Sequence, residues 1–144
     1  MKPTNIETEA AQFPALSKRA ARRVIQRAFV LVGREKSIRQ PLREASLNSL
    51  WRLEDWGLEW TVIVERGRFE FHRGRTGRPQ ITYSWQRAEN FFNQVETGAS
   101  TSDSFQCEGG REIQRVFAPV FTAFAKSLNG VLQYPFDDDG ERLL

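Results

Sequence analysis

Residues 111–132 constrain the fold of this chain more than any other stretch. Apolar side chains recur there at steps of three and four residues, which is the spacing of one helical face, and they are Ile113, Val116, Phe117, Val120, Phe121, Phe124, Leu128, Val131 and Leu132. A face this wide must be covered by protein or by ligand. Pro119 lies inside the pattern. It lacks a backbone donor, so we expect a kink or a break there.

The middle of the chain follows a different period. Apolar and polar side chains alternate in the runs 47–53, 60–65, 69–72 and 80–85, which predicts strands with one covered face. The short Gly-containing connections between them predict antiparallel neighbours, and residues 105–108 suit a fifth, short strand. The covered face is expected to carry the aromatic residues Trp51, Trp60, Phe69, Phe71, Tyr83 and Trp85.

Helices are predicted on both sides of these strands. Residues 14–32 have one apolar face and one basic face, and residues 34–46 suit a shorter, interrupted helix. Residues 86–97 again show helical spacing. Ser84 is the expected N-cap of that helix and Gly98 its expected C-terminal stop.

The length of the chain indicates one domain. With 144 residues the chain suits a single domain, which we place at residues 13–133, with a basic helical region at 13–46. Residues 1–12 are expected to be disordered and the acidic residues 134–144 to form a flexible tail. The single cysteine, Cys107, excludes an internal disulfide. Because the N-terminus lacks the apolar run of a signal peptide, we expect a cytoplasmic protein.

Positive charge gathers at the N-terminal end of the chain. Residues 1–43 carry ten Lys and Arg against three Glu, whereas the rest of the chain has an acidic excess. Four arginines share one face of the first predicted helix: Arg19, Arg22, Arg23 and Arg27. They could contact an anion or an anionic membrane surface, or simply form a solvated face. We do not expect nucleic-acid binding as the main function, because no aromatic residues share this basic face.

No set of residues indicates catalysis. His72 and Cys107 are the only residues of their kinds and lack ligand spacing, so we expect neither a metal nor a cofactor. The basic loop 74–77 lacks the strand–loop–helix context of a phosphate-binding loop, and a hairpin turn is the simpler interpretation. We therefore expect a protein that is not an enzyme.

The order of elements resembles the sterol carrier protein domain family. Three stretches carry the resemblance: the strand pair LEWTVIVERGRFEFHRG; PQITYSW followed by RAENFFNQVETG; and DSFQCEGGREIQRVFAPVF. They look like the family's strand pair with its Gly-containing turn, its strand followed by a helix that ends in Gly, and its last strand leading into the final helix. The resemblance covers about residues 50–132.

This resemblance implies an α+β domain with a curved, mainly antiparallel five-stranded sheet covered on one face by helices. In the family, an apolar tunnel between the helices and the sheet takes fatty acyl chains, sterols or other lipids, and the last helix helps to close it. Carried onto this chain, Phe117, Phe121, Phe124 and Leu128 would line or cover the tunnel. The opposite wall would include Trp85, Phe91 and Phe92.

Three functions remain open at the level of sequence. The first is a non-catalytic lipid-binding or lipid-handling protein, with an acyl chain or sterol-like ligand under the C-terminal helix. The second is a protein-interaction or regulatory module of the same fold with a filled tunnel. The third is a nucleic-acid binder that uses residues 18–43. The volume of any cavity beneath the last helix distinguishes the first two; the oligomeric state is not set by the sequence.

Overall fold

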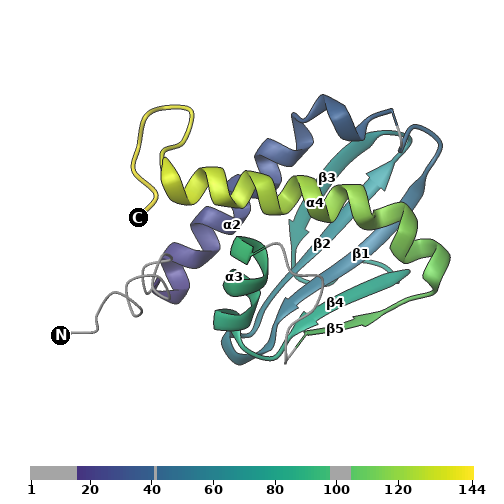
Figure 1. Ribbon diagram of the computed structural model, residues 1–144, viewed down its shortest axis with the longest axis horizontal. Coiled ribbons are helices and arrows are strands. Elements are labelled where there is room, and N and C mark those ends of the chain that lie inside the picture. Colours follow the sequence, from purple (N-terminus) through teal and green to yellow (C-terminus); the bar gives the residue numbers. More distant parts are fainter. Residues whose placement is uncertain (1–15, 41, 98–104) are drawn as a thin grey trace.

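The computed structural model describes residues 16–40, 42–97 and 105–144 and shows a sheet with helices on one face (Figure 1). Predictions for residues 1–12 and Gly98 lie outside these ranges. In chain order the elements are α2 (Lys18–Gly33), η1 (Lys36–Ile38), β1 (Ser46–Leu53), η2 (Glu54–Trp56), β2 (Leu58–Glu65), β3 (Arg68–Arg73), β4 (Ile81–Trp85), α3 (Ala88–Thr97), β5 (Phe105–Glu108) and α4 (Arg111–Gln133).

The five-stranded sheet has the order β3-β2-β1-β4-β5. Three of its four pairings are antiparallel, which confirms the mainly antiparallel sheet, but β1 and β4 are parallel. The expectation that β3 and β4 would be antiparallel neighbours is wrong. β3 is an edge strand, and residues 74–80 carry the chain past β2 and β1 to reach β4. Residues 74–77 are thus part of a crossover and not a hairpin turn.

This crossover lies against the sheet face opposite the helices. The Thr61 hydroxyl donates to the Gly74 carbonyl at 2.7 Å and accepts from the Thr76 amide at 2.9 Å. The Asn48 side-chain amide donates to the Thr76 carbonyl at 3.2 Å. Because side chains alternate along a strand, Leu50 belongs to the same face as Thr61. Leu50 is only 1% exposed, so this face is partly covered without any helix.

The helices begin with different caps. At the start of α2, the Ser17 hydroxyl accepts from the Ala20 amide at 3.1 Å. The predicted cap of α3 is wrong, because Ser84 belongs to β4. The Ala88 amide donates instead to the Asp55 carboxylate, at 3.1 Å from each oxygen. A cap supplied by a distant turn leaves no local sequence signal.

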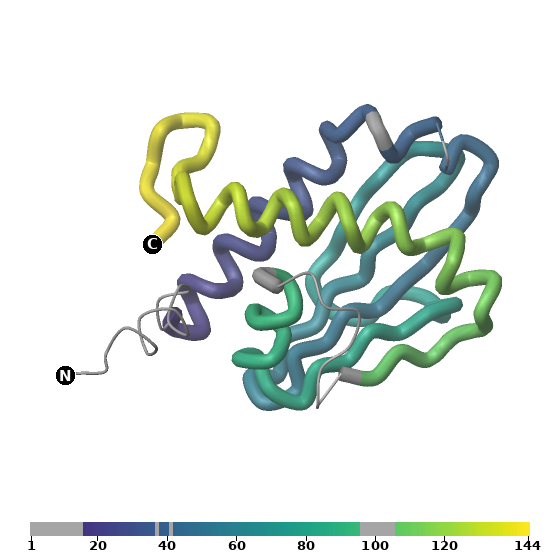
Figure 2. Tube along the Cα trace, in the orientation of Figure 1, coloured from purple at the N-terminus to yellow at the C-terminus, as the bar shows by residue number. Residues whose placement is uncertain are grey.

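The long helix α4 is not broken by its proline. Its bounds enclose Pro119, and Figure 2 shows the N-terminal part of the helix turning away from the long axis of the remainder. The second predicted helix, at residues 34–46, is mostly absent: the structure has the short η1 there and turns after it.

The core lies between the helices and the inner face of the sheet. The strand residues expected to be covered are indeed on this face, with Trp51, Trp60, Tyr83 and Trp85 all buried. Phe69 and Phe71, on the edge strand β3, are half-buried. The alternation in the sequence therefore predicted the inner face correctly.

Residues 134–144, for which the sequence predicts a flexible tail, fold back toward α2. Phe136 and Arg142 form a bridge, and Leu143 is 8% exposed and joins the core. The Asp138 carboxylate lies 3.0 Å from the Arg27 guanidinium and 2.6 Å from that of Arg34. The acidic segment thus neutralises part of the basic helix face.

The ion pair of Asp138 predicts a pH dependence. Hydrogen bonds from Arg34 and Arg27 hold the pKa of Asp138 well below its usual range. A lowered folded-state pKa stabilises the fold above the ordinary carboxylate pKa of about 4, and this contribution is lost as the pH falls below it. We expect Asp138→Asn to lower Tm at neutral pH, by an amount that shrinks toward about pH 2.

Thermal unfolding followed by circular dichroism at several pH values measures this difference. Asp139→Asn is the matched control, because Asp139 is a neighbouring exposed carboxylate that forms no ion pair in the described structure. Equal Tm losses for the two variants at neutral pH would contradict the proposed role of Asp138.

Candidate ligand-binding interior

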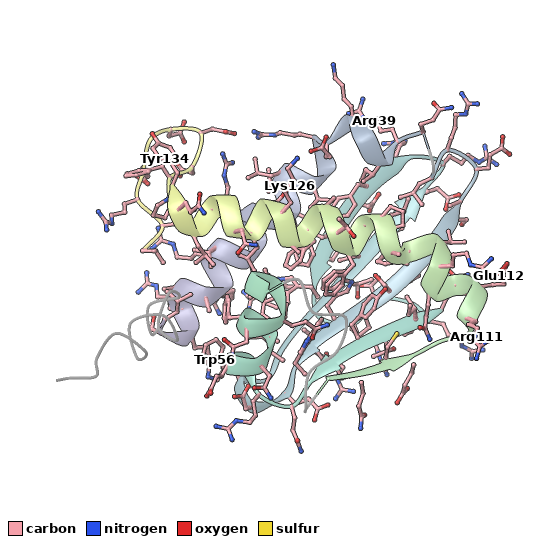
Figure 3. All side chains as sticks on the ribbon, viewed as in Figure 1. Arg39, Trp56, Arg111, Glu112, Lys126 and Tyr134 are labelled. Carbon is pink, nitrogen blue, oxygen red and sulfur yellow. The ribbon has the colours of Figure 1, made fainter. Side chains whose placement is uncertain are left out.

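Aromatic rings from five elements, α4 among them, meet between the helices and the sheet, and we call this set the aromatic interior. The strand alternation directs Trp51, Tyr83 and Trp85 toward the helices, while the helical repeat directs the α4 rings toward the sheet. The aromatic interior consists of Phe29 from α2, Trp51 from β1, Tyr83 and Trp85 from β4, Phe91 from α3, and Phe117, Phe121 and Phe124 from α4. Lys126, on the outer side of α4, points away from it (Figure 3).

The rings are in direct contact. The Phe124 ring centroid lies 4.7 Å from that of Phe29 and 4.9 Å from that of Trp51. Phe121 stacks on Trp51 at 5.6 Å with 14° between the ring planes. The Trp85 and Phe91 rings meet edge to face at 4.8 Å. These separations are in the range at which aromatic pairs add stability beyond the burial of their area.

The structure brings most of the predicted lining residues together. Phe117 and Phe124 are fully buried among the rings, and Phe121 is half-buried at their border. Phe92 packs edge to face on Phe91 at 5.1 Å. Leu128 is fully buried in the same core.

The predicted set omitted three members of the aromatic interior, Phe29, Trp51 and Tyr83, and also Trp60, which lines its cavity. Phe29, Trp51 and Trp60 contact or line the same space, although only the two tryptophans were expected on the inner face of the sheet. The apolar face of the first helix was the signal that could have added Phe29.

One cavity between these rings is lined entirely by described residues, and it is very small. The cavity has a volume of about 10 Å³ and is lined by Ile25, Phe29, Trp51, Arg52, Leu53, Trp60, Trp85, Phe91 and Phe124. A water molecule needs roughly 10–15 Å³, and pockets for organic ligands usually have roughly 300–1,000 Å³. A lipid can therefore enter this interior only if rings move.

One buried polar atom beside this cavity lacks a partner. Trp60 is 2% exposed, and its Nε1–H has no hydrogen-bond acceptor among the described residues. By contrast, the indole of Trp51 donates to the Ser49 hydroxyl at 2.9 Å and that of Trp85 donates to Gln94 Oε1 at 2.7 Å. Buried donors are nearly always paired, so the Trp60 Nε1–H is available to an oxygen acceptor.

Trp60 also borders a hollow on the surface. The hollow has a volume of about 290 Å³ and is lined by Gly57, Leu58, Glu59, Trp60, Arg73 and Gly74. The Glu59 carboxylate pairs with Arg52 at 3.1 Å, and Arg73 is exposed. Trp60 therefore lines both the cavity of the aromatic interior and this hollow.

The four arginines predicted to contact anions are in different surroundings. Arg23 donates to the Arg142 carbonyl at 2.9 Å, and the Arg27 side chain, 16% exposed, pairs with Asp138. Arg19 is exposed and Arg22 is half-buried. The C-terminal segment therefore occupies part of the expected basic face.

Burial affects the pKa of two ionisable groups, Tyr83 and Cys107. Burial, together with neighbouring Glu108, raises the pKa of the Cys107 thiol, so it is protonated at neutral pH. Burial also raises the pKa of Tyr83. Within residues 16–40, 42–97 and 105–144, no cluster of His, Cys, Asp or Glu suits a metal ion. The described helices also include none with the length and apolarity needed to span a membrane.

Comparisons with known proteins add information on the fold. No family model matches the sequence, and no curated protein sequence matches it either. Among solved structures, a sec-alkylsulfatase from Pseudomonas sp. aligns with 59% of this chain at 10% identity and a TM-score of 0.45, but the match spans only 14% of that enzyme. Sterol carrier protein 2 aligns at 11% identity and a TM-score of 0.49, over 77% of this chain and 94% of its own.

A third solved structure supports the fold. It is a conserved hypothetical protein from Thermus thermophilus, whose name gives sterol carrier protein as a candidate identity. It aligns at 11% identity and a TM-score of 0.52, over 75% of this chain and 85% of its own. The element order and the α+β layers agree with what the sequence resemblance implied. This chain therefore has the fold of the sterol carrier proteins.

Proposed function

We propose that this protein binds a lipid-like ligand, an acyl chain or a sterol-like molecule with at least one oxygen, between α4 and the sheet. The observation that carries this proposal is the buried Trp60 Nε1–H, which has no acceptor among the described residues and belongs to a wall of the aromatic interior. An oxygen of the ligand would accept this hydrogen bond while its apolar part packs among the rings. The proposed function involves no chemical step.

Apolar contact supplies the driving force. Each buried methylene contributes about 0.8 kcal/mol, so an acyl chain can offset the displacement of one or two rings. Phe121 is the ring best placed to move, because it is half-buried and stacks on the face of Trp51. Its outward rotation would leave space directly above the sheet.

The two halves of α4 are held differently. Near the C-terminal end, the Asn129 side-chain amide donates to the Val95 carbonyl of α3 at 3.2 Å. Pro119 has no amide hydrogen to donate within the helix, and the N-terminal half carries the exposed Val116. We therefore expect the N-terminal half to move when a ligand enters, with the C-terminal half as its anchor.

A second candidate function rests on the volume of the cavity. An interior with only about 10 Å³ of free space also suits a protein-interaction or regulatory module whose rings fill the tunnel permanently. Native purification, extraction with organic solvent and mass spectrometry, together with titration of a fluorescent fatty acid, separate the two. Extracted lipid or saturable displacement supports lipid binding, whereas empty extracts and no binding of the probe support the filled module.

Removal of the Phe121 ring tests entry into the interior. Phe121→Ala should increase the rate of uptake of the fluorescent fatty acid, because it opens space beside Trp51. It should also lower the free energy of unfolding by about 1–3 kcal/mol, less than for a fully buried ring. Stopped-flow fluorescence and urea unfolding measure the two effects.

Tyr134→Ala is the control for this experiment, since Tyr134 is an aromatic residue that is 71% exposed and follows the end of α4. It should change neither quantity. Uptake by Phe121→Ala no faster than by Tyr134→Ala would contradict entry at this position.

A pair of matched substitutions tests the role of Trp60. Trp60→Phe removes an indole donor that has no acceptor in the described structure, so it should weaken fatty-acid binding roughly tenfold with little loss of stability. Trp85→Phe removes the buried hydrogen bond to Gln94 and should lower the free energy of unfolding by about 1–3 kcal/mol. If Trp60→Phe bound the probe as tightly as wild type, the indole would have no part in binding.

A further inference from the structure

Four arginines surround a separate hollow at the other end of β2 and β3. Its volume is about 470 Å³, and it is lined by Gly33, Arg39, Gln40, Arg43, Arg66, Gly67, Arg68 and Phe69. We call it the arginine hollow; the labelled Arg39 in Figure 3 marks its position. It contains no acidic residue, and it is separate from the hollow beside Trp60.

Specific contacts assemble this hollow from two parts of the chain. The amide of Arg66, in the turn between β2 and β3, donates to the Ala45 carbonyl at 2.8 Å. A Cβ at Gly67 would lie 3.5 Å from the Arg39 carbonyl oxygen and 3.7 Å from Arg43 Cα. The tip of the strand pair is therefore fastened against the segment after α2, and the four arginines meet because of that packing.

The backbone at Arg66 is unusual. Its φ is +52° and that of the next residue, Gly67, is +83°. Turns of this kind favour Asn, Asp or Gly at both positions, and other residues are strained there. A long cationic side chain at the first position has no advantage for the turn itself, but it places a guanidinium on the wall of the hollow.

Among the described residues, no carboxylate pairs with the four arginines of the arginine hollow. Arg27, Arg34 and Arg52 each pair with a carboxylate, whereas in the described part of the chain no carboxylate lies within 4.0 Å of the arginines of this hollow. The nearby carboxylate of Glu65 accepts from the Ser46 hydroxyl at 2.7 Å. Four like charges around one space repel one another, and an anion between them would remove that repulsion.

We propose that the arginine hollow binds a phosphate group. Guanidinium groups form paired hydrogen bonds with phosphate oxygens, and several of them can surround one phosphate. The phosphate can belong to a small soluble ester or to the head group of a lipid. The half-buried Phe69 is relevant to a lipid head group, because an apolar side chain on the wall of the hollow can contact the lipid. Phe69 lines the hollow, and its ring centroid lies 6.4 Å from that of Phe29 in the aromatic interior.

Phosphate binding at the arginine hollow does not require a lipid in the aromatic interior. It is therefore tested with phosphate probes that differ from the fluorescent fatty acid. The full-length protein is titrated calorimetrically with inorganic phosphate, with pyrophosphate and with dihexanoyl phosphatidic acid below its micelle concentration. Arg43→Gln combined with Arg66→Gly removes two charges, and glycine suits the positive φ of the turn, so the fold is retained. Arg87→Gln is the control, since Arg87 is 65% exposed and does not line the hollow.

We expect the double variant to bind pyrophosphate at least roughly tenfold more weakly than wild type, with unchanged or higher Tm, and Arg87→Gln to bind like wild type. Wild-type binding should also weaken steeply with salt. Absence of binding in wild type, or equal affinity in the double variant and Arg87→Gln, would overturn the proposal.

The lipid probe identifies the source of the phosphate. Tighter binding of dihexanoyl phosphatidic acid than of pyrophosphate, with the difference removed by Phe69→Ala, indicates a lipid head group. Equal or weaker binding of the lipid probe indicates a soluble phosphate ester. Either result supports the phosphate site and leaves the proposed function of the interior to its own experiments.

Discussion

The contact of Phe124 with Phe29 and Trp51 is the interaction on which the rest of the structure depends. It joins α4, α2 and the central strand β1 at one point, with ring centroids less than 5.5 Å apart. These contacts are apolar and non-directional, so they hold the layers together without fixing where a helix must lie along the sheet. Directional contacts complete the arrangement at the periphery, such as Asn129 with Val95 and Asp55 with the start of α3.

This arrangement leaves only a small cavity between the described rings. The cavity between the rings has a volume of about 10 Å³, and Trp60 lines both this cavity and the hollow near Arg73. The arginine hollow is at the other end of the same strand pair. Lipid binding and phosphate binding therefore concern different parts of the molecule, the aromatic interior and the arginine hollow. The contact of Phe69 with Phe29 connects the two.

The elements with strong periodicity were predictable from sequence, and those defined by distant partners were not. The alternation around Trp51, Tyr83 and Trp85 was assigned correctly because side-chain direction follows from local geometry. The apolar stripe of α4 was also assigned correctly except for Val116, which is exposed. The parallel pairing of β1 with β4 was missed, since a short loop rich in glycine suits a hairpin and a crossover equally. The contact of Asp138 with Arg27 and Arg34 joins residues more than a hundred positions apart, so no local pattern could indicate it.

The sequence by itself determined which side chains point inward, because strand and helix periods are properties of the local backbone. The fold class also followed from the sequence, through the resemblance of its element order to the sterol carrier proteins. Only the tertiary structure decided whether those side chains leave room for a ligand. Free volume depends on how rings from α2, α4, β1 and β4 interdigitate. Only the tertiary structure also shows that the Trp60 Nε1–H has no acceptor among the described residues and that four arginines line one hollow. Both features depend on neighbours that folding brings together.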